Sequence, residues 1–519
     1  MKITASDVDS AERCPQQGYV KSRKPSRIVG PLAWEKRWDA DPIPLKHFLT
    51  ALGAYLYSGS LPERDRMSRS RRTYARAHPG VRTFLDHALD NYLDFLGSRE
   101  RPGIRARYLG FDTEFRVARG GALAVWAPVY EIGPGHVEVH RLRIRRTHPE
   151  LTGWAQLAAY AVSQAHGAAS VSVVDVSLYH DPAVARHESV LVDRISAGEA
   201  EAIYLADVRP HVMATVQGGP PSTGHGCGDC LVAGVCDALI PMDRALMQTG
   251  PGPYLRSISA NELFVYERCP AQWFLEKKTR LPLVTDRADN AATSRGRGVH
   301  DWLKVAHRRG RPCTADDLPL PADRSPQHVG FTALDDQQYA AAFPFLLTHL
   351  EQCPLAGGGE VLVADETLYG WDATADTVIA GRPDLLYRRD GILVLRETKS
   401  TEGPVAKDPD DARDGFDGIV YWWLRMMQAG YLQHFGATSG RVELEILGPD
   451  ESICHSYPTD DEDLEIIAET RVRHLVADWH ADTTWASRSN PLCTRCPVAV
   501  WCPDRDQYAT RVAAAGTPF

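Results

Sequence analysis

The sequence contains no long apolar segment. No run approaches the roughly 18 to 20 consecutive apolar residues that cross a bilayer. The first residues, MKITASDVDSAERC, also lack the apolar core of a secretion signal. These absences predict a soluble cytoplasmic protein with no membrane partner. In that reducing compartment the 11 cysteines are not expected to form a disulfide framework, which favours metal or cluster ligation instead.

The sequence also lacks a G-x4-G-K-S/T loop, so unwinding of a duplex would need a separate helicase. Its 519 residues suggest two to four domains, and 44% hydrophobic with 24% charged residues is typical of globular proteins. The net charge of −9 is uneven, because residues 1–250 carry 30 basic against 27 acidic residues and residues 251–519 carry 28 against 40. The mildly basic first half suits contact with a polyanion, although such charges are also ordinary solvated surface.

The chain repeats itself. The segment ITASDVDSAERCPQQGYVKSRK at the start recurs as ISANELFVYERCPAQWFLEKKT from Ile258. About thirty residues after the cysteine of each segment comes a histidine before an apolar pair, His47 or His300, and each half closes with C-x2-C-x5-C. We therefore expect two tandem copies of one domain, 1–245 and 256–519, joined by the Pro/Gly-containing stretch 241–257.

Each copy has the pattern of an α/β domain. Helical periodicity marks the flanks, short β-branched runs mark the middle, and a late amphipathic helix leads into a further strand. The segments concerned are helices at 45–57, 335–350, 151–166 and 419–435, and strands at 376–380, Ile392 to Leu395, 169–178 and 441–447. The expected fold in each copy is a small mixed sheet flanked by helices.

The stretch GRPDLLYRRDGILVLRETKS, residues 381–400, predicts a hairpin that carries chemistry. A turn at Arg389-Asp390-Gly391 joins two short strands, with Asp384 at the start of the first. Glu397 and Lys399 end the second strand two residues apart, so their side chains share one face. Pairing of the strands can bring all three side chains together.

Hydrolysis of a phosphodiester needs a hard cation, an activated water and positive charge near the developing oxyanion. Asp384, Glu397 and the backbone carbonyl of Thr398 are oxygen ligands that suit Mg²⁺ or Mn²⁺. His300 would add a nitrogen ligand and favour Mn²⁺. Lys399 is placed to orient the water and to neutralise charge.

These residues resemble the PD-(D/E)XK nuclease superfamily, and within it the RecB-type branch of CRISPR-associated and AddB-like iron-sulfur nucleases. The likeness covers residues 258–505 and rests on His300, Pro383-Asp384, Glu397-Thr398-Lys399 and four cysteines. It implies a restriction-endonuclease-like fold and a deoxyribonuclease acting on single-stranded DNA or DNA ends. Such nucleases often carry Gln-x3-Tyr on the next helix; here Gln428 and Tyr431 have a different spacing, which leaves the role of that helix open.

The first copy keeps the pattern without its acids. Alignment through Gly135 and Gly391 sets Arg141 against Glu397 and Arg143 against Lys399, while Asp384 falls on Pro128 or Val129. Arginine grips phosphate but does not coordinate a cation, so we expect an inactive, nucleic-acid-binding copy. The arginines predicted to contact nucleic acid are Arg69, Arg71, Arg72, Arg141 and Arg143; solvated surface charge is the alternative.

The cysteines form two ordered quartets. They are Cys14, Cys227, Cys230 and Cys236 in the first half, and Cys269, Cys493, Cys496 and Cys502 in the second. Four cysteines suit zinc or an iron-sulfur cluster by ligand count, and the family resemblance favours a 4Fe-4S cluster at each. The remaining Cys313, Cys353 and Cys454 are expected to be free buried thiols.

Three functions are compatible with these patterns. The first is a DNA-cutting enzyme, which the intact acids and Lys399 favour. The second is a nucleic-acid-binding scaffold with two inactive copies. The third is the nuclease subunit of a helicase-nuclease or defence complex.

Overall fold

The chain forms two compact units in the computed structural model. Unit 1 is built from Met1–Ala238, Val265–Asp286 and Thr483–Phe519, and unit 2 from Leu239–Phe264 and Arg287–Asp482. The hairpin at 381–400 therefore belongs to unit 2, and both cysteine quartets belong to unit 1. The domain boundaries expected from the repeat stay a prediction. The structure describes residues 2–23, 52, 77–99, 106–117, 121–144, 150, 152–179, 189–230, 232–250, 252, 256–283, 291–323 and 335–505.

Unit 1 contains a six-stranded mixed sheet. Its order is β1-β3-β4-β5-β6, with β2 also paired to β3; the β1/β3 and β4/β5 pairs are parallel and the others antiparallel. The strands are β1 (Lys2–Thr4), β2 (Arg107–Val117), β3 (Gly121–Gly133), β4 (His136–Arg143), β5 (Ser170–Ser177) and β6 (Ser189–Ser196). The α-helices are α1 (Ala5–Arg13), α2 (Pro15–Ser22), α7 (Pro79–Arg99), α8 (Gly153–His166), α9 (Ala197–Ile203), α10 (Arg209–Gln217) and α12 (Pro270–Trp273).

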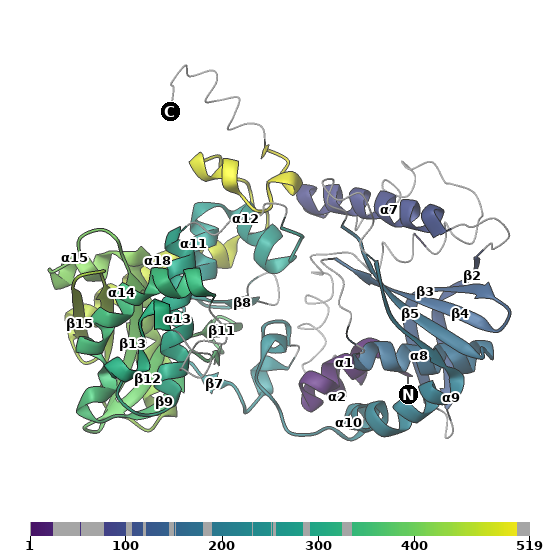
Figure 1. Cartoon of the computed structure of the whole chain (residues 1–519), viewed down its shortest axis with the longest axis horizontal. Coiled ribbons are helices and arrows are strands. Elements are labelled where there is room, and N and C mark those ends of the chain that lie inside the picture. The colour runs from purple at the N-terminus through teal and green to yellow at the C-terminus, as the bar shows by residue number, and fades with distance from the viewer. Residues whose placement is uncertain are drawn as a thin grey trace, which may run out of the picture. The chain divides into compact units, whose positions relative to one another are not determined.

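Helices cover both faces of this sheet (Figure 1). The apolar α8 packs Leu157 and Ala158 against Val125 and Val173 in the core of one face. On the other face, Tyr92 of α7 hydrogen bonds His140 of β4. The sheet is thereby covered on both sides, and every residue of β5 (SVSVVDVS) after Ser170 is buried.

Unit 2 contains two smaller sheets. The first has the order β7-β10-β11-β8 and the second β15-β14-β13-β12-β9. The strands are β7 (Ile240–Pro241), β8 (Arg256–Ile258), β9 (Glu360–Ala364), β10 (Leu368–Asp372), β11 (Thr377–Gly381), β12 (Leu385–Arg389), β13 (Ile392–Ser400), β14 (Gly440–Leu447) and β15 (Ser452–Pro458). The α-helices are α11 (Ala260–Arg268), which continues into unit 1, α13 (Ala291–Arg308), α14 (Asp336–Gln352), α15 (Pro409–Asp414), α16 (Ile419–Met426), α17 (Leu432–His434) and α18 (Glu462–Ala481).

The second sheet of unit 2 is packed by helices. The cluster formed by α13 and α14 includes Trp302, Leu303 and Tyr339 and reaches Leu447 of β14. The helix α14 begins at a capping box, in which Asp335 and Gln338 satisfy each other's backbone amides. The fold is thus mixed α/β, as expected.

The predicted elements at 335–350, 376–380, 419–435 and 441–447 are confirmed in unit 2, and those at 151–166 and 169–178 in unit 1. The predicted helix at 45–57 lies outside the described residues, apart from Leu52. The first part of the predicted linker at 241–257 packs into unit 2. Asp372 accepts a hydrogen bond from the Leu246 backbone amide at 2.8 Å, and the side chain of Leu246 is fully buried. Apolar residues between the prolines and glycines bind this part of the segment to unit 2.

Candidate active site

The hairpin of β12 and β13 brings Asp384 and Glu397 together. Leu385 pairs with Arg396 in the antiparallel register, so Asp384, one residue before β12, lies across from Glu397. The turn residues Asp390 and Gly391 have positive φ angles of 52° and 78°. Because a two-residue hairpin turn of this type requires positive φ at both positions, the Asp-Gly pair fixes the register that places the acids.

Both carboxylate oxygens of Asp384 are engaged. His300 Nδ1, from α13, lies 2.9 Å from Asp384 Oδ1, and the Thr398 backbone amide donates to Asp384 Oδ2 at 2.7 Å. The structure thus brings five of the predicted site residues together at Asp384, near the end of β13. The β13 strand supplies Glu397, Thr398 and Lys399, and the α13 helix supplies His300.

Glu397 is held by two donors. Lys399 Nζ donates to its Oε1 at 2.5 Å, and Trp423 Nε1, from α16, donates to its Oε2 at 2.8 Å. Lys399 and Glu397 are two apart on one strand, so this contact follows from the predicted shared face. Sequence reasoning missed Trp423. A signal was present, since α16 is the amphipathic helix that follows the hairpin, but the aromatic YWW run reads equally as core.

Charge in the site is balanced between acids and bases. The Asp384 carboxylate raises the pKa of His300 to about 9, although burial opposes this. Burial tends to raise the pKa of Asp384, but His300 and Lys399 outweigh it and the pKa is lowered. Burial raises the pKa of Glu397 despite the nearby Lys399. Positive charge beside the two carboxylates therefore stabilises their ionised forms against the effect of burial.

The site fits a hard divalent cation. The side chains of Asp384 and Glu397 are only 14% and 8% exposed, whereas those of His300 and Lys399 are 35% and 29% exposed. The carboxylates thus form the floor of the site and the basic groups lie closer to solvent. Two carboxylates supply the oxygen donors that Mg²⁺ and Mn²⁺ prefer, and the neighbouring imidazole favours Mn²⁺.

The helix after the hairpin contributes a residue other than the predicted pair. Gln428 donates to the Thr459 carbonyl at 2.9 Å, and the buried Tyr431 hydroxyl has no hydrogen-bond partner among the described residues. Tyr431 and Trp423 instead crowd Gly381, where a Cβ atom would collide with the tyrosine hydroxyl. Glycine at 381 therefore allows α16 to approach the strand closely enough for Trp423 to reach Glu397.

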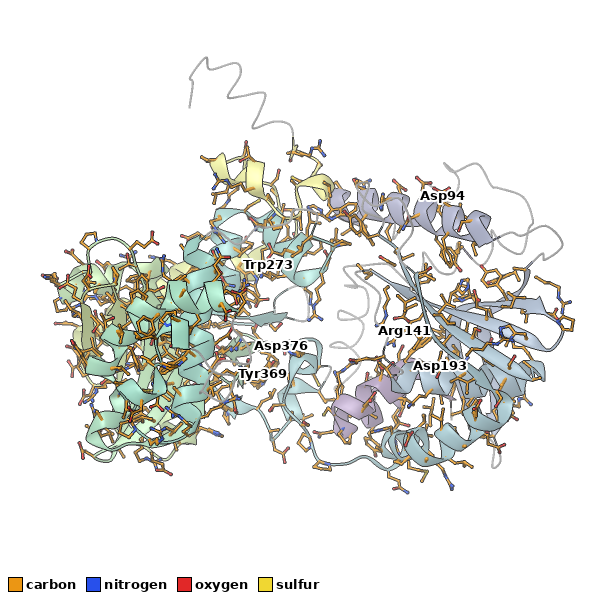
Figure 2. The ribbon with its side chains drawn as sticks, in the orientation of Figure 1. Asp94, Arg141, Asp193, Trp273, Tyr369 and Asp376 are labelled. Atoms are coloured by element: carbon orange, nitrogen blue, oxygen red, sulfur yellow. The ribbon has the colours of Figure 1, made fainter. Side chains whose placement is uncertain are left out.

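Two of the arginines predicted to contact nucleic acid are already paired. Arg141, labelled in Figure 2, donates to Thr152 at 2.7 Å and lies 3.2 Å from an Asp9 oxygen. Arg143 donates to Asp175 at 2.7 Å. A phosphate would have to compete with these carboxylates. The role of both arginines in nucleic-acid binding stays a prediction, and His47, Arg69, Arg71 and Arg72 lie outside the described residues.

The opposite face of β4 carries a separate polar group. Glu138 lies 2.6 Å from His140 Nε2, and His140 Nδ1 lies 2.8 Å from the Tyr92 hydroxyl. Glu138 is 2% exposed. As expected from strand alternation, this acid lies on the face of β4 opposite to Arg141.

Both cysteine quartets gather within unit 1, and their surroundings are alike. The backbone amide of Ser222 donates to Cys14 Sγ at 3.4 Å and that of Gly224 to Cys227 Sγ at 3.3 Å. In the second quartet, the corresponding amides five and three residues before Cys493 belong to Arg488 and Asn490. They donate to Cys269 Sγ and Cys493 Sγ, each at 3.4 Å.

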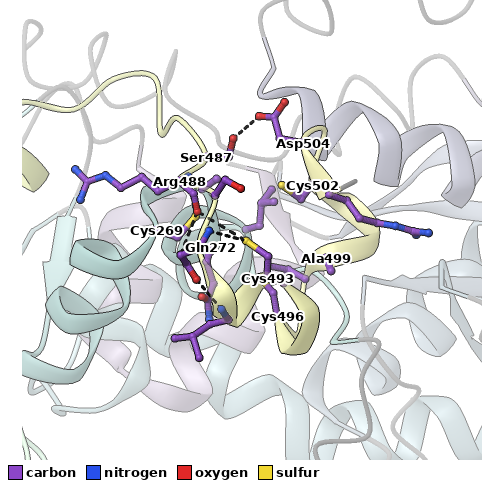
Figure 3. A pocket seen from close by; sticks show the side chains of 16 residues that line it. Cys269, Gln272, Ser487, Arg488, Cys493, Cys496, Ala499, Cys502 and Asp504 are labelled. Carbon is purple, nitrogen blue, oxygen red and sulfur yellow. Dashed lines mark hydrogen bonds between the residues drawn. The ribbon is translucent and has the colours of Figure 1, made fainter. Parts of the chain in front are cut away.

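The second quartet lines one pocket (Figure 3). Its four cysteines are Cys269, Cys493, Cys496 and Cys502. Cys269 lies between α11 and α12, directly before Pro270, just as Cys14 lies between α1 and α2 before Pro15. Four thiols around a pocket, with amides directed at the sulfurs, fit a thiolate-bound metal or cluster.

Residues 257–503 match the PD-(D/E)XK nuclease superfamily. This part of the chain is a PD-(D/E)XK domain, and the superfamily consists generally of nucleases that use divalent metals. A search of curated protein sequences gave no match. Among solved structures, the chain is similar to one titled "Crystal structure of SSO0001", with 13% identity, covering 48% of this chain and 87% of that chain. Its TM-score of 0.24 supports no inference.

Within the described part of the chain, no helix combines the length and the apolar character needed to cross a membrane.

Proposed function

We propose that this protein is a metal-dependent deoxyribonuclease that hydrolyses phosphodiester bonds in single-stranded DNA or at DNA ends. The observation that carries the proposal is the convergence of Asp384, Glu397, Lys399 and His300 on one hairpin end. The match of this segment to a superfamily of nucleases supports the same chemistry. The cytoplasm is the proposed location.

Asp384, Glu397, the Thr398 carbonyl and His300 are the proposed ligands of Mg²⁺ or Mn²⁺. When bound, the cation supplies Lewis-acid polarisation of the scissile phosphate and lowers the pKa of a bound water. Lys399, held against Glu397, offers positive charge for the phosphate oxygens that gain charge in the transition state. The Thr398 amide and Trp423 fix the orientations of Asp384 and Glu397, respectively.

The first half is proposed to be an inactive copy of the same domain that guides nucleic acid through its arginines. Shared strand pairings support the duplication. Thus β1 pairs with β3 as β8 pairs with β11, and β4 pairs in parallel with β5 as β13 does with β14. The matching amide contacts of the two cysteine quartets point the same way. Arg141 and Arg143 occupy the strand positions that Glu397 and Lys399 occupy in the active copy.

Each quartet is proposed to hold a 4Fe-4S cluster. Amide donors directed at the cysteine sulfurs support this, because such hydrogen bonds stabilise sulfur-rich clusters. Protein prepared without oxygen should be brown and should contain about eight irons per chain, four for each four-iron cluster. Colourless protein with zinc at both quartets would assign them to structural zinc instead.

Cleavage of end-labelled strands tests the nuclease activity. Asp384→Asn and Glu397→Gln should abolish Mn²⁺- and Mg²⁺-dependent cleavage while leaving the circular dichroism spectrum unchanged. Glu366→Gln is the matched control, since Glu366 is 63% exposed and pairs with Arg308 outside the site. Wild-type rates in both site variants would contradict the proposal.

The scaffold and the subunit alternatives give different results in the same assay. A scaffold with two inactive copies would bind the strands, and even the wild-type protein would leave them uncut in either metal. The nuclease subunit of a helicase-nuclease or defence complex would cut single strands alone but would need its partner to process a duplex.

A further inference from the structure

Four buried side chains outside the candidate active site form a second ligand group in unit 2. Near the end of α13 lies His307, with Cys313 shortly after it; near the end of α14 lies His349, with Cys353 directly after the helix. One ligand atom from each residue lies within 4.8 Å of all the others, and all four residues are buried. We propose that these residues bind a structural zinc ion.

The spacing of the two histidines fits a zinc tetrahedron. The Nε2 atoms of His307 and His349 lie 3.3 Å apart. Zn–N distances of about 2.0–2.1 Å at the tetrahedral angle separate two nitrogen ligands by about 3.3 Å. Two thiolates bound at about 2.3 Å from zinc would lie about 3.8 Å apart. This distance is below the 4.8 Å that separates the ligand atoms at most. All four ligands come from the protein, as in structural rather than catalytic zinc sites.

The surroundings prepare His349 to act as a ligand. Glu445 Oε1, on β14, lies 2.7 Å from His349 Nδ1 and accepts a hydrogen bond from it, which directs the Nε2 lone pair toward the group. A carboxylate behind a metal-bound histidine is the usual orienting partner in zinc sites. Glu445 is itself fully buried and lies 3.7 Å from Arg396, so its own charge is paired.

Charge also favours zinc at this position. Two thiolates and two neutral imidazoles cancel the charge of Zn²⁺, so the loaded site places no net charge in the core. A two-iron cluster fits less well, because it would hold the cysteines and the histidines on different irons and so further apart.

The expectation that Cys313 and Cys353 are free buried thiols was right about their burial and missed their partners. Both are buried, whereas Cys454 is only partly so. The Cys313 amide donates to Cys353 Sγ at 3.3 Å, which ties the loop after α13 to the end of α14. Zinc would add a second, stronger tie between these helices.

The proposed zinc site is connected to the candidate active site in two ways. His307 follows His300 on the same helix, two turns further on. Glu445 accepts a hydrogen bond from the Thr398 hydroxyl at 3.1 Å, and Thr398 holds Asp384 through its amide. The zinc proposal itself stands on the four ligands and does not depend on nuclease activity.

Metal analysis of the full chain tests the proposal. Wild-type protein, purified without a metal-affinity step, should contain one more zinc per chain than Cys313→Ser/Cys353→Ser, with equal iron in both. Cys454→Ser is the matched control and should keep the wild-type zinc content. Equal zinc in wild type and double variant would overturn the proposal, and so would a Cys313–Cys353 disulfide found by mass spectrometry of unreduced protein.

A second pair of variants covers the case in which the double variant does not fold. His307→Ala should lose the same zinc. His307→Cys should retain it, because three cysteines and one histidine also form a zinc site. Unchanged zinc in His307→Ala, or loss of zinc from both variants, contradicts the ligand role of His307.

Discussion

Trp423 offers a sharp test of how the candidate site is held. Its indole Nε1 donates to Glu397 Oε2 at 2.8 Å, and both residues are buried. Trp423→Phe removes this donor and keeps an aromatic ring in the core. Glu397 would then remain bound to Lys399 through its other oxygen but would be free to rotate.

The size of the effect follows from the lost hydrogen bond. A hydrogen bond to a charged group is worth about 1.5–3 kcal/mol. Since about 1.4 kcal/mol corresponds to a factor of ten, Trp423→Phe should lower kcat/KM by about 10- to 100-fold. Loss of a residue that orients a metal ligand typically weakens metal binding by a similar factor of about 10 to 100. We therefore expect the Mn²⁺ concentration for half-maximal rate to rise at least about tenfold.

The neighbouring Trp422 supplies a matched control. It is equally buried on the same helix, but its Nε1 has no hydrogen-bond partner among the described residues. Trp422→Phe therefore removes the same ring volume without removing a bond to Glu397. Initial rates on an end-labelled strand, measured across a Mn²⁺ series, compare the two variants. Equal Mn²⁺ requirements and equal rates in both would refute the orienting role of Trp423.

Three further outcomes are expected. Lys399→Ala should lower the cleavage rate roughly a hundredfold or more, whereas Lys407→Ala, at an exposed lysine paired with Glu451, should not change it. Asp317→Asn should lower the free energy of unfolding by about 1–3 kcal/mol at neutral pH, because Asp317 accepts hydrogen bonds from two arginines. Those arginines outweigh burial and hold the Asp317 pKa well below its usual value. The stabilisation is thus present above a pH of about 4 and is lost as the pH falls, so urea curves of variant and wild type should converge in acid. Replacement of three arginines should reduce the salt dependence of single-strand binding by about two units of log–log slope, and an unchanged slope contradicts a guiding role. These are Arg69, Arg71 and Arg72.

The local features of the candidate site could be predicted from the sequence. Strand alternation puts Glu397 and Lys399 on one face, and the Asp390-Gly391 turn sets the register that brings Asp384 across from Glu397. These relations depend on residues within one hairpin, so no distant contact is needed to fix them. The cysteine quartets could be predicted for a different reason, because two segments of the sequence recur and can be compared with each other.

The partners of these residues were decided by tertiary packing. Trp423 reaches Glu397 from a helix 26 residues later, and the aromatic run that contains it has the same pattern as an ordinary core helix. Arg141 was expected to face nucleic acid, yet Asp9 lies beside it from 132 residues earlier in the chain. Alternation along a strand gives the face of a side chain but not the residue that will lie opposite.

The His307, Cys313, His349 and Cys353 group depended most on the tertiary structure. The two histidines lie near the ends of separate helices and each cysteine lies after the helix, with 40 positions between Cys313 and Cys353. Nothing in their spacing distinguishes them from ordinary buried residues. Packing of α13 against α14 brings the helix ends together, and Glu445 from β14 then orients His349. The sequence by itself determined that these four residues have side chains able to bind a metal. Only the packing of α13 against α14 determined that the four side chains lie close together.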